Sequence, residues 1–69
     1  MEILAKNLKQ IRLEKHLSQK EVSIALNIAV STYANWEQGR RDPSLDDLVK
    51  ITNYLEVSID FLLGREEYY

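Results

Sequence analysis

The sequence predicts an all-α fold, a compact domain of five short helices, and three observations support this prediction. Apolar residues recur at spacings of three and four, which is the period of one face of a helix. Serines precede three of these stretches, where a hydroxyl can accept from the unpaired backbone N–H groups that begin a helix. No stretch alternates polar and apolar residues for long enough to predict a strand, so we expect helices packed around one core.

The first helix is expected over residues 3–16. Its buried face should carry Leu4, Leu8 and Ile11. Lys6 and Lys9 interrupt the apolar pattern near the amino terminus, so neither a signal peptide nor a membrane span is expected.

A capping box predicts the start of the second helix. The Ser18 hydroxyl can accept from the N–H of Glu21 while the Glu21 carboxylate accepts from the N–H of Ser18, and Leu17 can close over Val22. The buried stripe should continue through Ala25 and Leu26. Asn27 then suits the left-handed conformation in which the chain leaves the helix.

The third helix is expected from about Val30 to Gln38, ended by Gly39. Its inward positions are Tyr33, Trp36 and Glu37, and its outward positions are Val30, Ser31, Ala34 and Asn35. The outward positions hold small or amide-bearing side chains.

Two further helices complete the domain. The residue before Pro43 is pushed out of helical geometry, so a loop is expected there. Ser44 follows this loop and should cap the fourth helix. Its inner stripe is expected to be Leu45, Leu48, Ile51 and Leu55. Ser58 should cap a short fifth helix that ends at Gly64. Residues 1–64 would then form the domain and residues 65–69 a frayed tail.

Residues 17–39 have the form of a helix-turn-helix, and the chain resembles the phage-repressor family of Cro and lambda-repressor-like (Xre-type) regulators. The matching motifs are Ser18-Gln19, Trp36-Glu37-Gln38-Gly39, Pro43-Ser44-Leu45 and the ending from Val57 to Gly64. The match covers roughly residues 4 to 64. The resemblance implies a compact five-helix lambda-repressor-like DNA-binding domain.

Four positions depart from the family pattern. Ala29 stands where the family usually has a Ser or Thr cap, which should cost about 1 kcal/mol of helix stability. Asn27 replaces the usual Gly, and Val30 and Asn35 replace long polar or basic residues. The operator preference therefore cannot be taken from a relative.

The resemblance implies a cytoplasmic transcription regulator, expected to be a repressor that binds a near-palindromic operator in double-stranded DNA as a homodimer. The third helix would lie in the major groove, with base contacts from Val30, Ser31, Ala34 and Asn35. An Asn amide can bond adenine N6 and N7 at once, and the methyl groups of Val30 and Ala34 suit thymine. For Val30 the alternative is a partly buried packing role.

The phosphate contacts are expected from the amino-terminal half. Residues 1–41 carry seven Lys and Arg against four Glu, a local charge of plus 3, whereas residues 42–69 carry minus 5. By resemblance Gln19 bonds a phosphate at the start of the second helix. The other candidates are Arg40, Arg41, Lys9 and Lys20. For each lysine the alternative is solubility alone.

Two further sets have structural roles. By resemblance Arg12 and Glu37 form an ion pair that joins the first helix to the end of the third. The dimer interface is expected on the fourth and fifth helices, because the fifth has more apolar surface than it can bury beneath itself. Its candidate residues are Ile59, Phe61 and Leu62. For Phe61 the alternative, equally weighted, is packing within the chain against Ile3 or Leu4.

Neither catalysis nor metal binding is expected. The chain has one histidine, His16, and no cysteine, so it offers no metal-ligand cluster and no cofactor is expected. Adjacent acidic pairs on a helix do not face one site, so an enzyme is not expected either. The alternative function is a protein-interaction module, such as the antitoxin of a toxin–antitoxin pair. An unknown protein partner would then bind the acidic half and the tail, Tyr68-Tyr69.

Overall fold

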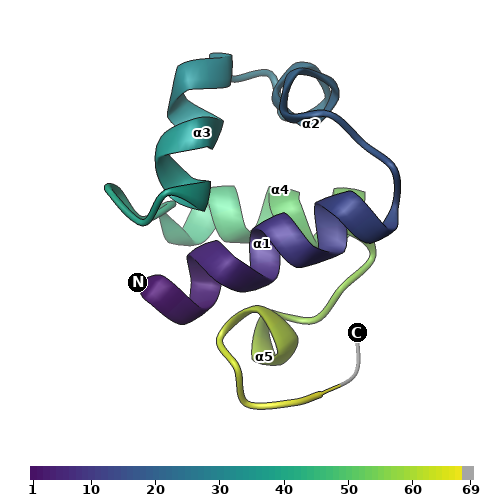
Figure 1. The fold of residues 1–69 in the computed structure, drawn as a ribbon, viewed down its shortest axis with the longest axis vertical. Helices are drawn as coiled ribbons and strands as arrows, with labels where there is room; N and C mark the ends of the chain where they lie inside the picture. The colour runs from purple at the N-terminus through teal and green to yellow at the C-terminus, as the bar shows by residue number, and fades with distance from the viewer. Residues whose placement is uncertain (68–69) are drawn as a thin grey trace.

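The structure, a computed structural model, describes residues 1–67 and contains five helices and no strand among them (Figure 1). The helices are α1 (Glu2–Glu14), α2 (Gln19–Leu26), α3 (Val30–Glu37), α4 (Leu45–Leu55) and α5 (Ile59–Leu62). The predicted all-α fold is confirmed.

The helices α2 and α3 form one end of the molecule and α5 lies at the other, with α1 and α4 between them (Figure 1). Only Asn27–Ala29 separate α2 from α3, so the two helices form the predicted helix-turn-helix. None of the helices in residues 1–67 is long and apolar enough to cross a membrane.

Serine caps begin three of the helices as the sequence predicts. The capping box is present at Ser18, whose hydroxyl accepts from the Glu21 N–H at 3.0 Å while the Glu21 carboxylate accepts from the Ser18 N–H at 2.9 Å. Ser44 forms a second capping box with Asp47, and Ser58 caps α5. By contrast, α3 begins at Ala29 with no side-chain bond to its N–H groups.

Left-handed residues end two of the helices. Asn27 ends α2 at φ 58°, which confirms its predicted role, and Glu56 ends α4 at φ 57°. His16 also has φ 58°, two residues after α1 ends at Glu14. The turn at His16 lets the Leu17 N–H donate to the Arg12 carbonyl in the last turn of α1. The first helix therefore ends two residues earlier than predicted and begins one residue earlier.

The core contains residues from all five helices. Its members are Leu4, Leu8, Ile11, Val22, Leu26, Tyr33, Trp36, Ile51, Leu55, Val57, Phe61 and Leu62. The Asn7 side chain adds a polar link, because its amide donates to the carbonyls of Phe61 and Leu62 at 2.9 and 3.3 Å. These bonds fix α5 against α1.

Two residues predicted to be buried are exposed. Leu45, at the start of α4, is 71% exposed. Each step of three residues leaves a helical side chain about 60° short of a full turn. Leu45 and Ile51 are two such steps apart, so their side chains point about 120° away from each other around the helix axis. Ala25 is also exposed, and Ser23 is the small residue of α2 that faces the core.

Candidate nucleic-acid interface

The outward side of α3 carries all four residues predicted to contact bases. Val30 is 47% exposed, Ser31 is exposed, and Ala34 and Asn35 are half-buried. Residues at these spacings lie on one side of a helix. Small side chains therefore leave α3 with a slender outward surface. Within residues 1–67 the Asn35 side-chain amide forms no hydrogen bond.

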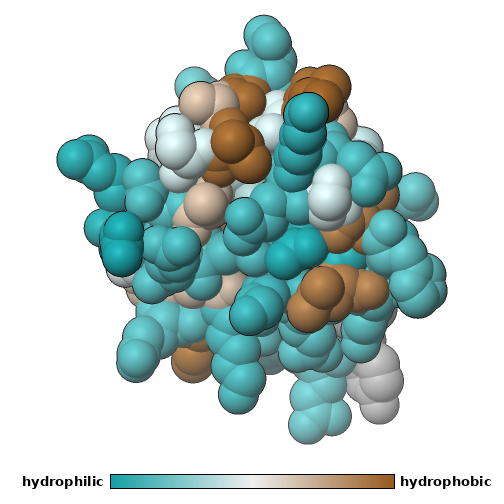
Figure 2. All heavy atoms as spheres, turned by 45° about the horizontal axis from the view of Figure 1, so that its top comes forward, coloured by the Kyte–Doolittle hydropathy of each residue, from teal (hydrophilic) through white to brown (hydrophobic). Residues whose placement is uncertain are grey.

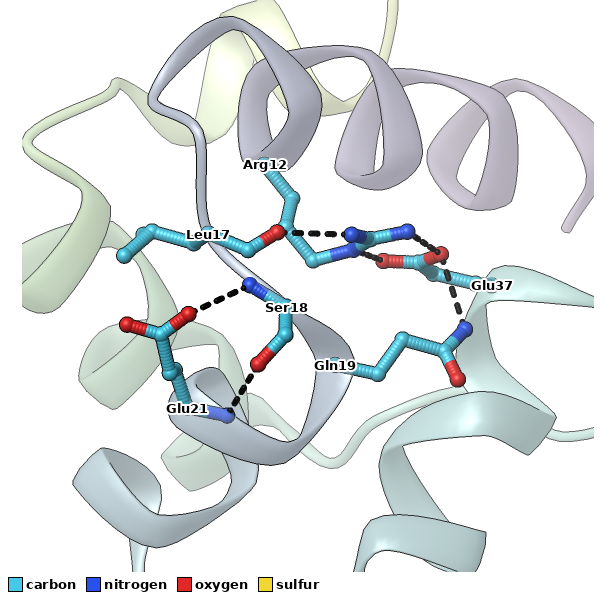
Figure 3. Close-up of polar contacts among 6 residues, drawn as sticks. All are labelled: Arg12, Leu17, Ser18, Gln19, Glu21 and Glu37. Carbon is cyan, nitrogen blue, oxygen red and sulfur yellow. Dashed lines mark hydrogen bonds and ion pairs between the residues drawn. The ribbon is translucent and has the colours of Figure 1, made fainter.

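A buried ion pair connects α1 to the end of α3 (Figure 3). Arg12 Nε donates to Glu37 Oε2 at 2.6 Å, and Arg12 Nη2 donates to Glu37 Oε1 at 3.0 Å. The third donor, Arg12 Nη1, bonds the Leu17 carbonyl at 2.8 Å. The two side chains are only 9% and 2% exposed, so this is a desolvated bidentate pair of the kind for which Arg is suited.

Gln19 extends this network. Its amide Nε2 donates to Glu37 Oε1 at 3.1 Å, and its side chain is half-buried between the start of α2 and the end of α3 (Figure 3). The sequence predicts a phosphate contact for Gln19 but gives no sign of this contact with Glu37. No spacing rule relates two residues on different helices, so the link needed the folded geometry.

The ion pair keeps its charges at neutral pH. Burial alone would raise the pKa of Glu37, but the hydrogen bond from Arg12, supported by smaller contributions from other neighbouring polar side chains including Gln19, outweighs burial and holds that pKa below its ordinary value of 4.5. The hydrogen bond to Glu37 raises the pKa of Arg12. Burial, followed by the nearby Glu37 carboxylate, raises the pKa of Tyr33, whose buried hydroxyl has no hydrogen-bond partner among the described residues.

The predicted basic contacts are exposed on three elements. Lys9 lies on α1 and Lys20 on α2, while Arg40 and Arg41 lie in the loop after α3. The backbone N–H groups of both arginines donate to the Asn35 carbonyl, at 3.0 and 3.4 Å, so this loop is fixed to the end of α3. The backbone of these two arginines therefore has a defined place next to the helix-turn-helix.

The loop also contains an ion pair that the sequence analysis did not identify. Asp42, directly after Arg41, accepts from the amino-terminal NH₃⁺ of Met1 at 2.6 Å. The pair is half-exposed and offsets an acidic charge next to the two arginines. Its partners are far apart in sequence, which is why no local pattern indicated it.

Two exposed polar residues, one within α3 and one directly after it, are not among the predicted contacts. Thr32 is exposed within the helix, and Gln38 is exposed at its end. Gln38 follows Ser31 by seven residues, which is the spacing of one helix face, so the outward phase already contained the signal. The exposed apolar residues of α2 and α3 include Ile24 and Val30. Figure 2 shows brown hydrophobic patches between hydrophilic side chains on this face of the molecule.

The residues proposed for the dimer interface lie on α5, away from the helix-turn-helix. Phe61 is 4% exposed and Leu62 is fully buried, and both belong to the same core cluster as Leu4. This burial agrees with the alternative of packing within the chain for Phe61. Ile59 remains half-buried, so an interface on this side needs other residues besides Phe61 and Leu62.

The fold and this surface define a helix-turn-helix domain of the Cro and lambda-repressor-like class. Comparison with known proteins agrees: residues 8–62 match the family model described as helix-turn-helix, so the chain belongs to this family. It is a family of DNA-binding regulators and not of enzymes. No solved structure matches the chain.

Several curated relatives are transcription regulators by name. The chain is 42% identical over 64 residues to the HTH-type transcriptional regulator ImmR of Bacillus subtilis, which covers 93% of this chain and 50% of that protein. It is 40% identical over 60 residues to the HTH-type transcriptional regulator AnsR of the same organism, covering 87% of the chain and 52% of AnsR. It is 38% identical over 48 residues to the cryptic phage CTXphi transcriptional repressor RstR of Vibrio cholerae, covering 70% of the chain and 43% of RstR. The chain spans about half the length of the curated relatives it matches.

Proposed function

We propose that this chain is the DNA-binding domain of a transcription regulator, and that it represses by occupying a near-palindromic operator as a homodimer with α3 in the major groove. The observation that carries the proposal is the exposed outward side of α3, held in place from behind by the buried Arg12–Glu37 pair. The names of the relatives support regulation of transcription, and RstR supports repression. Repression by occupancy requires only that bound protein blocks polymerase.

Base recognition would be biased toward A·T pairs. The Asn35 side-chain amide can accept from adenine N6 and donate to adenine N7, a bidentate pairing that favours adenine over the other bases. Val30 and Ala34 offer methyl groups, for which the thymine methyl is the complementary surface in the major groove. Ser31 can donate or accept and so adds contact with little selectivity.

Phosphate contacts would fix the domain on the duplex. Gln19 stands at the first position of α2, where backbone N–H groups point out of the helix, and Arg40 and Arg41 follow α3. Lys9 and Lys20 are exposed and would supply the remaining cations. These contacts position α3 without reading sequence.

A homodimer would give the recognition enough length, because one helix reads too few base pairs for a selective site. Two-fold symmetry matched to a near-palindrome places half-site centres about 34 Å apart. With Phe61 and Leu62 buried, Ile59 would be joined in the interface by the exposed Leu45 and Val49 of α4. Sedimentation of the protein alone and on one palindromic duplex tests this, and one protomer at saturation would contradict it.

Selection of binding sites from random duplex DNA tests the central proposal. We expect an enriched near-palindrome with A·T pairs at positions facing Asn35, and half-sites spaced by one helical turn. Enrichment of no sequence would contradict DNA-binding regulation. Enrichment of a single half-site without symmetry would keep sequence-specific binding and contradict the homodimer.

A further inference from the structure

One carboxylate oxygen serves two partners at the base of the helix-turn-helix. Glu37 Oε1 accepts from Arg12 Nη2 at 3.0 Å and from Gln19 Nε2 at 3.1 Å. A carboxylate can only accept hydrogen bonds, so the nitrogen end of the Gln19 amide must face it. Figure 3 shows the amide nitrogen turned toward Glu37 and the amide oxygen on the far side. The orientation of this amide is therefore fixed by chemistry.

We propose that Glu37 is a positioning residue for DNA binding, because it holds the Gln19 side chain in the orientation in which it contacts a phosphate. The inference rests on the proposed function, in which the start of α2 faces the DNA backbone. A phosphate oxygen takes only donors, and one amide N–H of Gln19 is already bonded to Glu37. The second N–H of the same nitrogen is then the donor for the phosphate.

The rigidity of Glu37 makes it suited to this role. Its side chain is 2% exposed and both of its oxygens accept from Arg12, so it has no freedom to follow Gln19. An unrestrained glutamine samples many rotamers and loses that freedom when it binds, whereas a glutamine already held loses less. Glu37 thereby raises the affinity without touching DNA.

The network also fixes the spacing between two parts of the interface. Gln19 is the first residue of α2 and Glu37 the last of α3, while Arg12 bonds both Glu37 and the Leu17 carbonyl just before the α2 cap. Arg12 of α1 thus holds the start of α2, where Gln19 is predicted to contact a phosphate, in a fixed position relative to α3. A shift of Glu37 would displace Gln19 relative to α3.

A double-mutant cycle tests the coupling. Gln19→Ala, Glu37→Gln and the double variant are titrated against the best selected duplex, at a temperature where circular dichroism shows each to be folded. Gln19→Ala should weaken binding about tenfold on every sequence, the effect of removing a hydrogen bond to a charged group. Its salt slope should stay unchanged, because a neutral amide releases no counterion. Gln10→Ala and Glu14→Gln, both exposed on α1, are the matched controls.

If Glu37 acts through Gln19, Glu37→Gln weakens binding in the wild-type background and causes no further loss in Gln19→Ala. Glu37→Gln should lower the melting temperature whether residue 19 is Gln or Ala, because replacing Glu37 removes the ion pair with Arg12 in either case. Glu37→Asp is the second variant: it keeps the charge opposite Arg12 but withdraws the carboxylate from Gln19, and should show the same non-additive affinity.

Two results would overturn the inference. Affinity losses that multiply would mean that Glu37 affects binding through the fold and independently of Gln19. If Gln19→Ala bound DNA with wild-type affinity, Gln19 would make no contact with a phosphate that contributes to binding. Both results leave sequence-specific binding intact, whereas a wild-type protein that selects no site overturns the proposed function.

Discussion

Helices α3 and α4 are stabilised in different ways. The fourth helix begins with a capping box, in which the Asp47 N–H donates to the Ser44 hydroxyl at 3.1 Å, and Asp46 and Asp47 place negative charge in its first turn. The third helix begins at Ala29 with no side-chain cap and no acidic residue in its first turn. The helix proposed to read DNA therefore has the weaker local start.

Contacts with other helices replace local stabilisation in α3. Tyr33 and Trp36 are buried in the core cluster that also contains residues of α1 and α2, and Glu37 is paired with Arg12 of α1. These three side chains lie on the side of α3 away from the outward residues. The fourth helix is therefore specified largely by its own sequence, whereas α3 depends on α1 and α2 and keeps its outward side unoccupied.

Glu37→Ala is the variant expected to show this dependence with the largest loss of stability. It leaves the buried Arg12 without its partner, and breaking a buried pair in this way should cost about 3 kcal/mol or more. Thermal unfolding followed by circular dichroism measures the loss. Glu14→Ala, which removes an exposed carboxylate from α1, should change stability by less than about 0.5 kcal/mol. A Glu37→Ala protein that melts like wild type would make the pair irrelevant to stability.

The pH dependence of unfolding sharpens the same point. The folded-state pKa of Glu37 lies below 4.5, so its charge contributes stability that is present above that value and is lost as pH falls through the folded pKa. The melting-temperature difference between wild type and Glu37→Gln should stay constant from neutral pH to about pH 5 and narrow in more acidic buffer. A difference that already narrows near neutral pH would mean that Glu37 is not held ionised.

On the outward side of α3, Asn35→Ala tests base reading. The variant should lose about 1–3 kcal/mol on the best site and relax one position per half-site, because a bidentate adenine contact discriminates by that amount. Competition titrations with single-base variants of the selected duplex measure both effects. An equal loss on every duplex would show that Asn35 reads no base.

Arg40 and Arg41 should behave differently from Asn35. Their replacement by Ala should weaken binding to all sequences alike and reduce the salt slope by roughly one unit for each phosphate that the protein no longer neutralises. Titrations over a range of salt concentrations measure the slope. An unchanged slope in the double variant would place this loop outside the interface.

Much of this fold was readable from the sequence because its signals are local. The caps at Ser18, Ser44 and Ser58 and the left-handed Asn27 depend on neighbours within four residues. What the sequence could not supply depends on packing between helices. The burial of Phe61 and the bond from Gln19 to Glu37 are set by which helix lies against which.

A matched pair of cap variants tests the contrast between α3 and α4 directly. Ser44→Ala should cost about 1 kcal/mol, because it removes the hydroxyl that accepts from the Asp47 N–H. Ala29→Ser should gain up to about 1 kcal/mol, since Ala29 already has the extended backbone of a capping residue, φ −68° and ψ 144°. Chemical denaturation measures both changes. If α3 is fully determined by its contacts with α1 and α2, its new cap adds stability without altering affinity for the selected duplex. A gain in stability that comes with weaker binding would instead show that the uncapped first turn of α3 is needed at the DNA.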